Sequence, residues 1–514
     1  MGCIQSTYPY QESIFLELVT KGLVLVRQAT ASRGLRAGRI AALAVLLISL
    51  AASAPAQAPP QPAGVATPAA PVQIPQPAIN ASTYQGSVSR QQITPGVLSL
   101  SLSDAIQRGL RYNLGLILTS QNVESARASR LEELQSLLPT VTGKLQEADQ
   151  ETDIAAEGLR IPGFPAIIGP YGYTDVRGSL DWTLLNLSAL QNYLATKHDF
   201  QAANLSVEDA RQMVVLTVGN AYLLVIADAA NIQAAQAQVA TSKVSLDQAV
   251  ANHQAGVSPL LDELRARVDY QTQEQTLIAA KDSWAKDKIA LARAIGLPLE
   301  QKFEITDTEP YAPLDHLNAD QAVQEALANR ADLKALEQQV AAAQHARKAA
   351  TDERLPTVKF SGDYGDIGIN PSHSHGTGDA TGSLDVPIFE EAKLRGDAKQ
   401  AQAQLDEETE QLSNLRGQIA ADVRDSILDI QAAEKLVDVA RSNVQLANEA
   451  LSEAQQRYKA GVSDNLAVSQ AQQSVAQANE QYVAALYQHN VAKLSLARAL
   501  GVAQSDYKDY LGGK

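Results

Sequence analysis

The chain has 514 residues, a formal net charge of −15 and only 5% aromatic residues. A nucleic-acid partner is not expected, because the phosphate backbone recruits basic proteins. The only cysteine is Cys3, which excludes a disulfide framework and a cysteine-ligated zinc site. Few aromatic residues and long stretches rich in Ala and Gln favour long packed helices over large globular cores.

The N-terminal region predicts a secretory signal. Three arginines precede an apolar run at 40–52, and an Ala-x-Ala pattern at 54–56 is typical of a cleavage site. The run is too short to span a bilayer. The sequence therefore predicts three segments: an upstream extension from a misassigned start (1–32), a signal peptide (33–56) and a Pro/Ala-rich linker (57–100).

The remaining chain contains two copies of the same sequence pattern. Residues 255–296 and 460–501 share their first and last motifs at a constant offset of 205 residues, and Leu138-Pro139 recurs as Leu355-Pro356. Self-similarity at this length indicates a duplicated structural half rather than a short solenoid repeat. We divide the region into a first repeat (101–300), a connection (301–319), a second repeat (320–503) and a C-terminal tail (504–514).

Each repeat is predicted to contain one very long helix. Apolar or aromatic residues recur at steps of seven in both copies, which indicates coiled-coil packing. No helix breaker interrupts 187–255, so this helix is on the order of 100 Å long, too long for an ordinary bundle helix. We expect it to pack beside two shorter helices of about 35 to 38 residues, stacked end to end. The seven-residue positions are Val218, Val225, Ile232, Val239, Leu246 and His253, then Val423, Ile430, Val437, Val444, Leu451 and Tyr458.

Two segments, at about 139–184 and 356–388, have a period of two and predict β-hairpins. Small, aromatic and apolar residues alternate with polar ones, as in Val358-Lys359-Phe360-Ser361. This alternation suits membrane strands with one lipid-facing side. Four strands cannot close a membrane barrel, and open edges are not tolerated in lipid. Three copies would supply twelve strands.

No residue pattern points to catalysis. The phosphate-binding, zinc-protease and nucleophile-elbow motifs are absent, and the paired acids on the predicted helices are interpreted as solvated faces. His373 and His375 lie in a Gly-rich stretch that we interpret as a hairpin loop rather than a metal site. We therefore expect neither an enzyme nor a cofactor.

Taken together, these motifs resemble the outer membrane efflux protein (TolC-like) family. The resemblance covers about residues 100–503 and is carried by the repeated Leu-Pro-Thr-Val and Gly-Ser-Leu-Asp motifs and by the turns at 255–259 and 460–464. It implies a mainly α fold whose duplicated long coiled-coil helices form a trimeric α-barrel. Four strands per chain would contribute to a shared 12-stranded β-barrel in the outer membrane, with the helices in the periplasm.

The resemblance also implies partners. It describes a homotrimeric exit duct of a tripartite efflux or type I secretion system, surrounded by outer-membrane lipid. A periplasmic membrane-fusion adaptor would dock at the tip, with an inner-membrane pump reached through it. The tip residues implied are Gly256, Val257, Ser258, Gly461, Val462 and Ser463.

One difference from the family concerns the tip constriction. Family members carry aspartates six and nine residues after the second turn glycine, where this chain has Ala467 and Gln470. We expect Asp262, Glu263 and Asp464 to supply the acidic constriction instead. A different class, a soluble periplasmic coiled-coil adaptor or scaffold, remains the alternative. The sequence does not name the cargo.

Overall fold

The computed structural model describes residues 82–89, 93–156, 158, 160–307, 311–314 and 318–511. The predicted extension (1–32), the signal peptide (33–56) and the first part of the predicted linker (57–81) lie outside the described residues. The described residues all belong to one unit, 72–514.

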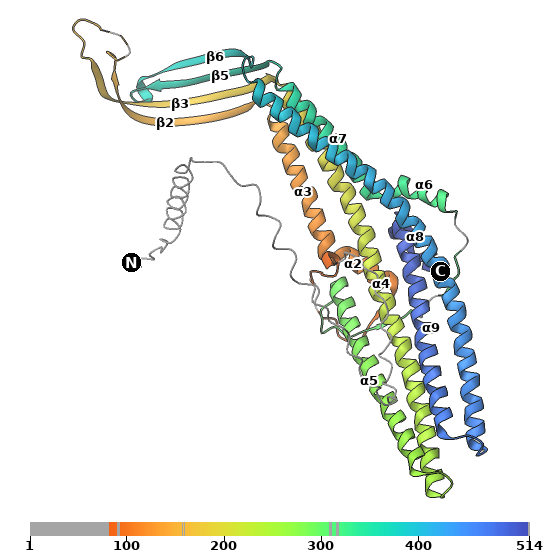
Figure 1. Cartoon of the computed structure of the whole chain (residues 1–514). Helices are drawn as coiled ribbons and strands as arrows, with labels where there is room; N and C mark the ends of the chain where they lie inside the picture. The colour runs from red at the N-terminus through yellow and green to blue at the C-terminus, as the bar shows by residue number, and fades with distance from the viewer. Residues whose placement is uncertain are drawn as a thin grey trace, which may run out of the picture. The chain divides into compact units, whose positions relative to one another are not determined.

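Two long helices, α4 (Leu187–Gln254) and α8 (Glu391–Lys459), run through the molecule (Figure 1). The prediction of an unbroken helix after 187 is confirmed. Its start is set by Asn186, whose side chain accepts a hydrogen bond from the backbone N–H of Ala189 at 3.0 Å, as an N-cap residue does. All the seven-residue positions predicted in both helices are buried or half-buried, so the coiled-coil seam is real.

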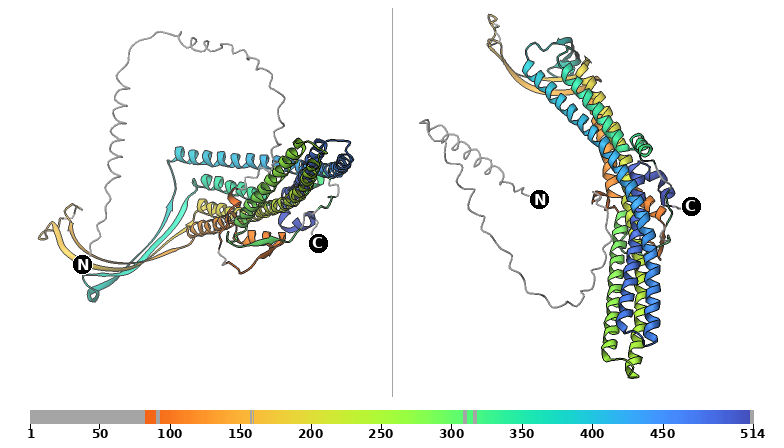
Figure 2. Two further views of the ribbon diagram at one scale, coloured as in Figure 1. Left: turned by 90° about the horizontal axis from the view of Figure 1, so that it is seen from below. Right: turned by 45° about the vertical axis from the view of Figure 1, so that its right-hand side comes forward.

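Shorter helices flank the long ones. At the level of α3 (Leu114–Gln135) and α7 (Ala331–Asp352), the packing order is α3, α4, α7, α8. At the level of α5 (Leu260–Ile295) and α9 (Asn465–Ala499), it is α5, α4, α9, α8. Figure 2 shows these helices from below and after a turn about the vertical axis. The predicted end-to-end stacking is confirmed. In the described part of this layer α8 has short helices on one side only, and α6 (Ala319–Asn329) also packs against it.

The helix expected before each Leu-Pro motif is not continuous. The first is divided into α2 (Leu102–Tyr112) and α3, the second into α6 (Ala319–Asn329) and α7. The breaks fall at equivalent residues, Asn113 and Arg330, whose backbones leave the helical region. The Asn113 side chain accepts the N–H groups of Gly115 and Leu116 and so begins a new helix, a competition that asparagine offers the backbone.

The main core lies at mid-length, where α2, α4, α5 and α9 meet. Here residues assigned to the linker and the connection pair in parallel as β1 (Leu98–Leu100) and β4 (Phe303–Ile305), and residues assigned to the tail form α10 (Ala503–Leu511). The linker, the connection and the tail therefore contain regular structure that the sequence did not predict. The cause is the same in all three cases, because each segment packs over the buried part of α4. The Tyr222 hydroxyl contacts the carbonyl of Leu100 at 2.9 Å. By length and composition, α4 could cross a membrane, but 72% of its most apolar window is buried inside the protein.

The predicted hairpins are confirmed as a four-stranded antiparallel sheet, in the order β2-β3-β5-β6. Its strands are β2 (Thr140–Asp153), β3 (Ile167–Leu185), β5 (Thr357–Gly368) and β6 (Ser374–Asp385). Single turns η1 (Ser82–Tyr84) and η2 (Pro371–His373) complete the described elements. The sheet lies at one end of the helices, and the α4–α5 and α8–α9 turns lie at the other (Figure 1).

Candidate functional site

One face of the sheet is apolar. Residues paired directly across antiparallel strands project to the same side, so the register assigns every side chain to a face. Val141 pairs with Leu180, which pairs with Gly362, and this row continues to Ala380. Glu147 and Asp366 end this face on the side away from the helices. Its other members are Gly143, Leu145, Val176, Gly178, Trp182, Phe360, Tyr364, Gly376, Gly378, Gly382 and Leu384.

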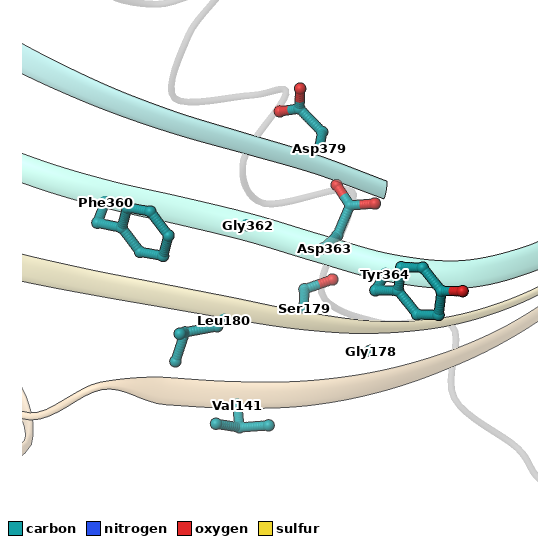
Figure 3. Close-up of a pocket in the computed structure, with 9 residues that line it drawn as sticks. All are labelled: Val141, Gly178, Ser179, Leu180, Phe360, Gly362, Asp363, Tyr364 and Asp379. Carbon is teal, nitrogen blue, oxygen red and sulfur yellow. The ribbon is translucent and has the colours of Figure 1, made fainter. Parts of the chain in front are cut away.

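The opposite face is polar and carries paired charges. Arg177 forms ion pairs with Asp175 at 3.3 Å and with Asp363 on the next strand. Lys359 pairs with Asp385 at 2.9 Å. Figure 3 shows Ser179 and Asp363 projecting to the side away from Val141 and Leu180. This division is what a membrane strand with lipid on one side and a water-filled lumen on the other requires.

The outer strands of the sheet, β2 and β6, have no further strand partner among the described residues. Both are exposed along most of their length. Unpaired strand edges present rows of free N–H and C=O groups, which lipid cannot satisfy. The sheet is therefore incomplete as a membrane element within one chain.

The open side of α8 carries an apolar stripe. Leu428, Leu436, Val439 and Leu446 are 61%, 51%, 58% and 58% exposed. Their spacing of 8, 3 and 7 residues places them on one face of the helix. The internal repeat provides a reference, because Leu428 corresponds to Leu223 of α4, which is only 2% exposed. The same position is thus covered in one repeat and open in the other.

The other flank of the layer carries a second stripe, on α5. Leu261, Val268, Ile278 and Ile289 are 52%, 60%, 68% and 52% exposed. They follow one another at steps of 7, 10 and 11 residues, which a coiled-coil repeat places along one face. Neither stripe was singled out from the sequence, because periodicity alone does not show which apolar face lacks a neighbour.

The two helix turns have the same backbone structure. Gly256 and Gly461 have φ values of 72° and 71°, the left-handed conformation that favours glycine. In the first turn, the N–H groups of Gly256 and Val257 donate to the carbonyls of His253 and Asn252, both at 2.9 Å. The second turn makes the equivalent bonds at 3.0 Å, so both are Schellman caps.

The valine that follows each glycine is held out from the protein. Val257 is 75% exposed and Val462 is 70% exposed, whereas Ser258 and Ser463 are half-buried. The two turns are also connected, since the amide of Asn252 donates to the hydroxyl of Tyr458 at 3.3 Å. The predicted docking residues therefore lie together at one end of the molecule, with two apolar side chains presented to solvent.

The three predicted constriction acids have different surroundings. Asp262 is 6% exposed, and its carboxylate lies 3.8 Å from the guanidinium of Arg265. Glu263 is paired with Arg267 at 2.7 Å. Asp464 is exposed at the start of α9 and makes no side-chain capping bond. Only Asp464 therefore presents an open carboxylate at the tip.

Two neighbouring carboxylates, the buried Asp228 on α4 and the half-buried Asp287 on α5, lie near the core. Burial raises the pKa of Asp228 to about 8, and the neighbouring Asp287 adds to the shift. Burial, together with the same two acids, raises the pKa of Tyr487 on α9 to about 12. In α8 the position of Asp228 is occupied by Ala433. The pair was not identified from the sequence, because its members lie on different helices.

Within the described ranges, no group of three or more His, Cys, Asp or Glu residues could hold a metal ion. His373 lies in η2, the turn of the second hairpin, and His375 is in β6 rather than in a loop. No site described above combines a nucleophile with a base.

Comparison with known proteins agrees with this arrangement. A family model described as "Outer membrane efflux protein" matches residues 106–297 and 322–502. The pyoverdine export outer membrane protein OpmQ of Pseudomonas putida is 26% identical over 322 residues, covering 61% of this chain and 66% of the relative. The toluene efflux pump outer membrane protein TtgF of the same species is 25% identical over 430 residues, or 78% and 83% of the two chains.

Solved outer-membrane channels share the fold. The Campylobacter jejuni CmeC channel superimposes with a TM-score of 0.71 at 18% identity, covering 85% of this chain and 95% of that one. The Vibrio cholerae outer membrane protein VceC gives 0.69 at 19% identity, covering 78% and 96%. The family, these relatives and these folds confirm the predicted location in the outer membrane. The chain belongs to the outer membrane efflux protein family.

Proposed function

We propose that three copies of this chain form one continuous passive channel across the outer membrane and the periplasm. The observation that carries the proposal is the sheet, whose faces are divided into apolar and polar and whose two edges are unpaired in one chain. β5 and β6 have 12 residues each, enough to cross a bilayer when tilted. Twelve strands would therefore enclose a lumen lined by the polar face.

The strand directions allow closure. Each neighbouring pair in the sheet is antiparallel, so β2 and β6 run in opposite directions. β6 of one copy beside β2 of the next then forms another antiparallel pair, as in bacterial barrels. Two copies would give only eight strands, whose interior is filled by side chains. Three copies give the smallest ring with room for cargo.

The helical flanks support the same assembly. The open side of α8, with Leu428, Leu436, Val439 and Leu446, has the position in its repeat that α9 covers on α4. The stripe on α5 of a neighbouring copy would fill that position. Burying a leucine contributes about 1.5–3 kcal/mol, so four such residues per contact are a substantial gain.

We assign the tip to adaptor docking in a tripartite efflux system, with an inner-membrane pump reached through the adaptor. The support is the pair of exposed valines, Val257 and Val462, on two rigid turns. The names of the relatives, which mention pyoverdine and toluene, favour small molecules over secreted proteins as cargo. Asp464 is the acid that we assign to the entrance, because Asp262 and Glu263 are ion-paired with arginines.

The decisive experiment measures the mass of the detergent-purified particle and its single-channel conductance. A conducting trimer is the expected result, and a monomer or a non-conducting particle would overturn the proposal. Release of the protein by carbonate without detergent would favour a soluble periplasmic scaffold instead.

Two matched variants test the sheet faces. Leu180→Arg places a charge on the apolar face, which costs about 2–4 kcal/mol at the middle of a bilayer. Ser179→Arg places the same charge on the polar face and should leave membrane insertion intact. Equal loss of both variants from the outer-membrane fraction would contradict the assignment of the faces.

The entrance acid is tested by conductance. Asp464→Ala should raise conductance or reduce cation preference more than Asp262→Ala does, because only Asp464 presents an unneutralised carboxylate. An unchanged current in Asp464→Ala would remove this residue from the constriction.

A further inference from the structure

Four side chains bridge α4 and α7 in the upper half of the helical layer. His345 on α7 contacts Gln191 on α4, with 2.7 Å between Nδ1 and Oε1. His198 on α4 contacts Gln338 on α7 in the same way, at 2.8 Å. Between these contacts the two imidazole rings are stacked, with centroids 5.3 Å apart and planes inclined by 15°. The group joins the first repeat to the second within one chain.

The two contacts fit neutral rings that carry the proton on Nδ1. Each glutamine offers its carbonyl oxygen to an Nδ1 atom, so each Nδ1 carries a proton and donates. A neutral imidazole with a proton on Nδ1 has a free acceptor at Nε2. Both rings are half-buried, so a second proton on either ring would be poorly solvated.

The surrounding charges oppose protonation of His345. Burial lowers its pKa, and Lys348 and His198 lower it further. Asp199, next to His198, is the nearby acid on α4. Two imidazolium ions stacked at this separation would repel each other strongly in a half-buried interface.

The neighbouring helices bring charges that are already paired or turned elsewhere. On α3, Arg127 and Arg130 lie over the ring of Phe200. The α3 residues that face Asp199 are uncharged: Asn122, Ser125, Ala126 and Ser129. On α8, Arg416 pairs with Glu337 and Lys393 with Glu353, on either side of His345 along α7.

The second repeat has no such group at the equivalent seam. Counting by the repeat offsets, His198 and Gln191 correspond to Ala403 and Gly396 on α8. His345 and Gln338 correspond to Ala128 and Gln121 on α3, so the glutamine recurs but neither histidine does. In a ring of copies, the seams would therefore alternate between one with histidines, inside each chain, and one without, between chains.

We propose that His198 and His345 form a pH-sensitive clasp between the two repeats, closed while both rings are neutral and loosened when they gain protons. The sign follows from the opened state, in which His345 returns to its ordinary pKa of 6.5 and binds a proton more readily. The clasp is therefore fully stable above that pH and loses stability as the pH falls below it. It lies within one chain, and only its effect on the duct rests on the proposed channel.

Hydrogen exchange measured by mass spectrometry tests the clasp in the full-length, detergent-purified protein. Peptides covering 187–202 and 334–349 should open several-fold faster at pH 5.5 than at pH 7.5, after correction for intrinsic exchange. In His345→Gln this difference should disappear. The matched control, His375→Gln on the exposed strand β6, should keep it.

The result that overturns the clasp is an equal pH response in His345→Gln and the unsubstituted protein, or no response in either. If His345→Gln does not fold, His198→Asn provides the same comparison. The buried His489 on α9 does not confuse the readout, because it lies outside both peptides. A particle that is not a trimer would overturn the proposed channel and leave this measurement valid.

Discussion

The two long helices descend from one repeat, yet they are buried to different degrees. α4 has 22 buried residues among 68, and α8 has 10 among 69. Both keep their seven-residue seam, so the difference does not lie in the seam. It lies in the number of neighbours. In the described chain α8 packs against α6, α7 and α9, whereas α4 packs against α2, α3, α5, α7, α9 and α10.

The comparison teaches that this chain is a segment of a closed structure rather than a finished domain. Leu223 and Leu428 are the same residue in the same place of the repeat, one 2% and one 61% exposed. An apolar side chain kept at an open position indicates that another surface covers it in the assembly. The sheet leads to the same conclusion, because its inner strands are paired on both sides and its outer strands on one side only within the described chain.

The strongest test of the difference between α4 and α8 is to truncate Leu223 and Leu428 separately. Leu223→Ala should lower the free energy of unfolding of the protomer by about 2–5 kcal/mol, because it leaves a cavity in the core. Leu428→Ala should lower it by less than about 1 kcal/mol in a dissociated protomer. Denaturant unfolding in detergent measures both, and equal losses would contradict the difference between α4 and α8.

A charge on the open side of α8 should act on assembly instead of folding. Leu436→Glu should shift the particle from trimer to monomer, with a loss of about 1.5–3 kcal/mol of apolar burial per contact. Light scattering and helical circular dichroism measure mass and folding separately. Glu449→Gln, another surface change on α8, serves as the control, and a stable trimer of Leu436→Glu would argue against this interface.

Substitution of the turn glycine should destabilise α4 and α8 equally, because the turns that follow the two helices have the same backbone structure. Gly256→Ala and Gly461→Ala each force a left-handed conformation on a residue with a Cβ, which costs about 1–2 kcal/mol. No side chain or backbone atom crowds either position, so strain is the only expected cost. Thermal unfolding should show equal decreases in Tm. An unchanged Tm for one variant would show that its turn does not require the left-handed conformation.

The last prediction concerns the pH dependence of stability and Asp228, whose position in α8 is occupied by Ala433. The pKa of Asp228 is raised to about 8 from 3.8, so the folded state keeps a proton that the unfolded state has lost. Stability therefore falls as the pH rises from about 4 to about 8. Asp228→Asn should raise Tm by a few degrees at pH 8 and flatten its dependence on pH. Asp282→Asn, exposed on α5, is the control, and an unchanged Tm profile would contradict the shift.

Much of the fold could be predicted because its signals are local. A seven-residue seam, a period of two and a glycine before an exposed valine each depend on a few neighbouring residues. The breaks at Asn113 and Arg330 were missed because each depends on packing as well as propensity. Arg330 is 6% exposed and donates to Asp332 and to Asp422 of α8, a partner 92 residues away.

The candidate site could also be predicted only in part. Its turn residues follow from the sequence, since Gly256 and Gly461 meet a backbone requirement that glycine meets best. The environment of the acids does not, because the pairing of Asp262 and Glu263 with arginines depends on side-chain geometry at the tip.

The sequence by itself determined the duplication, the two long helices, the hairpins and the incomplete strand count, because periodicity and repetition are properties of one chain read in order. Only the tertiary structure decided which apolar stripes stay open, which strands are edges and how His198 meets His345. Those features depend on which elements become neighbours, and neighbours are chosen by the packing of surfaces that lie far apart in the chain.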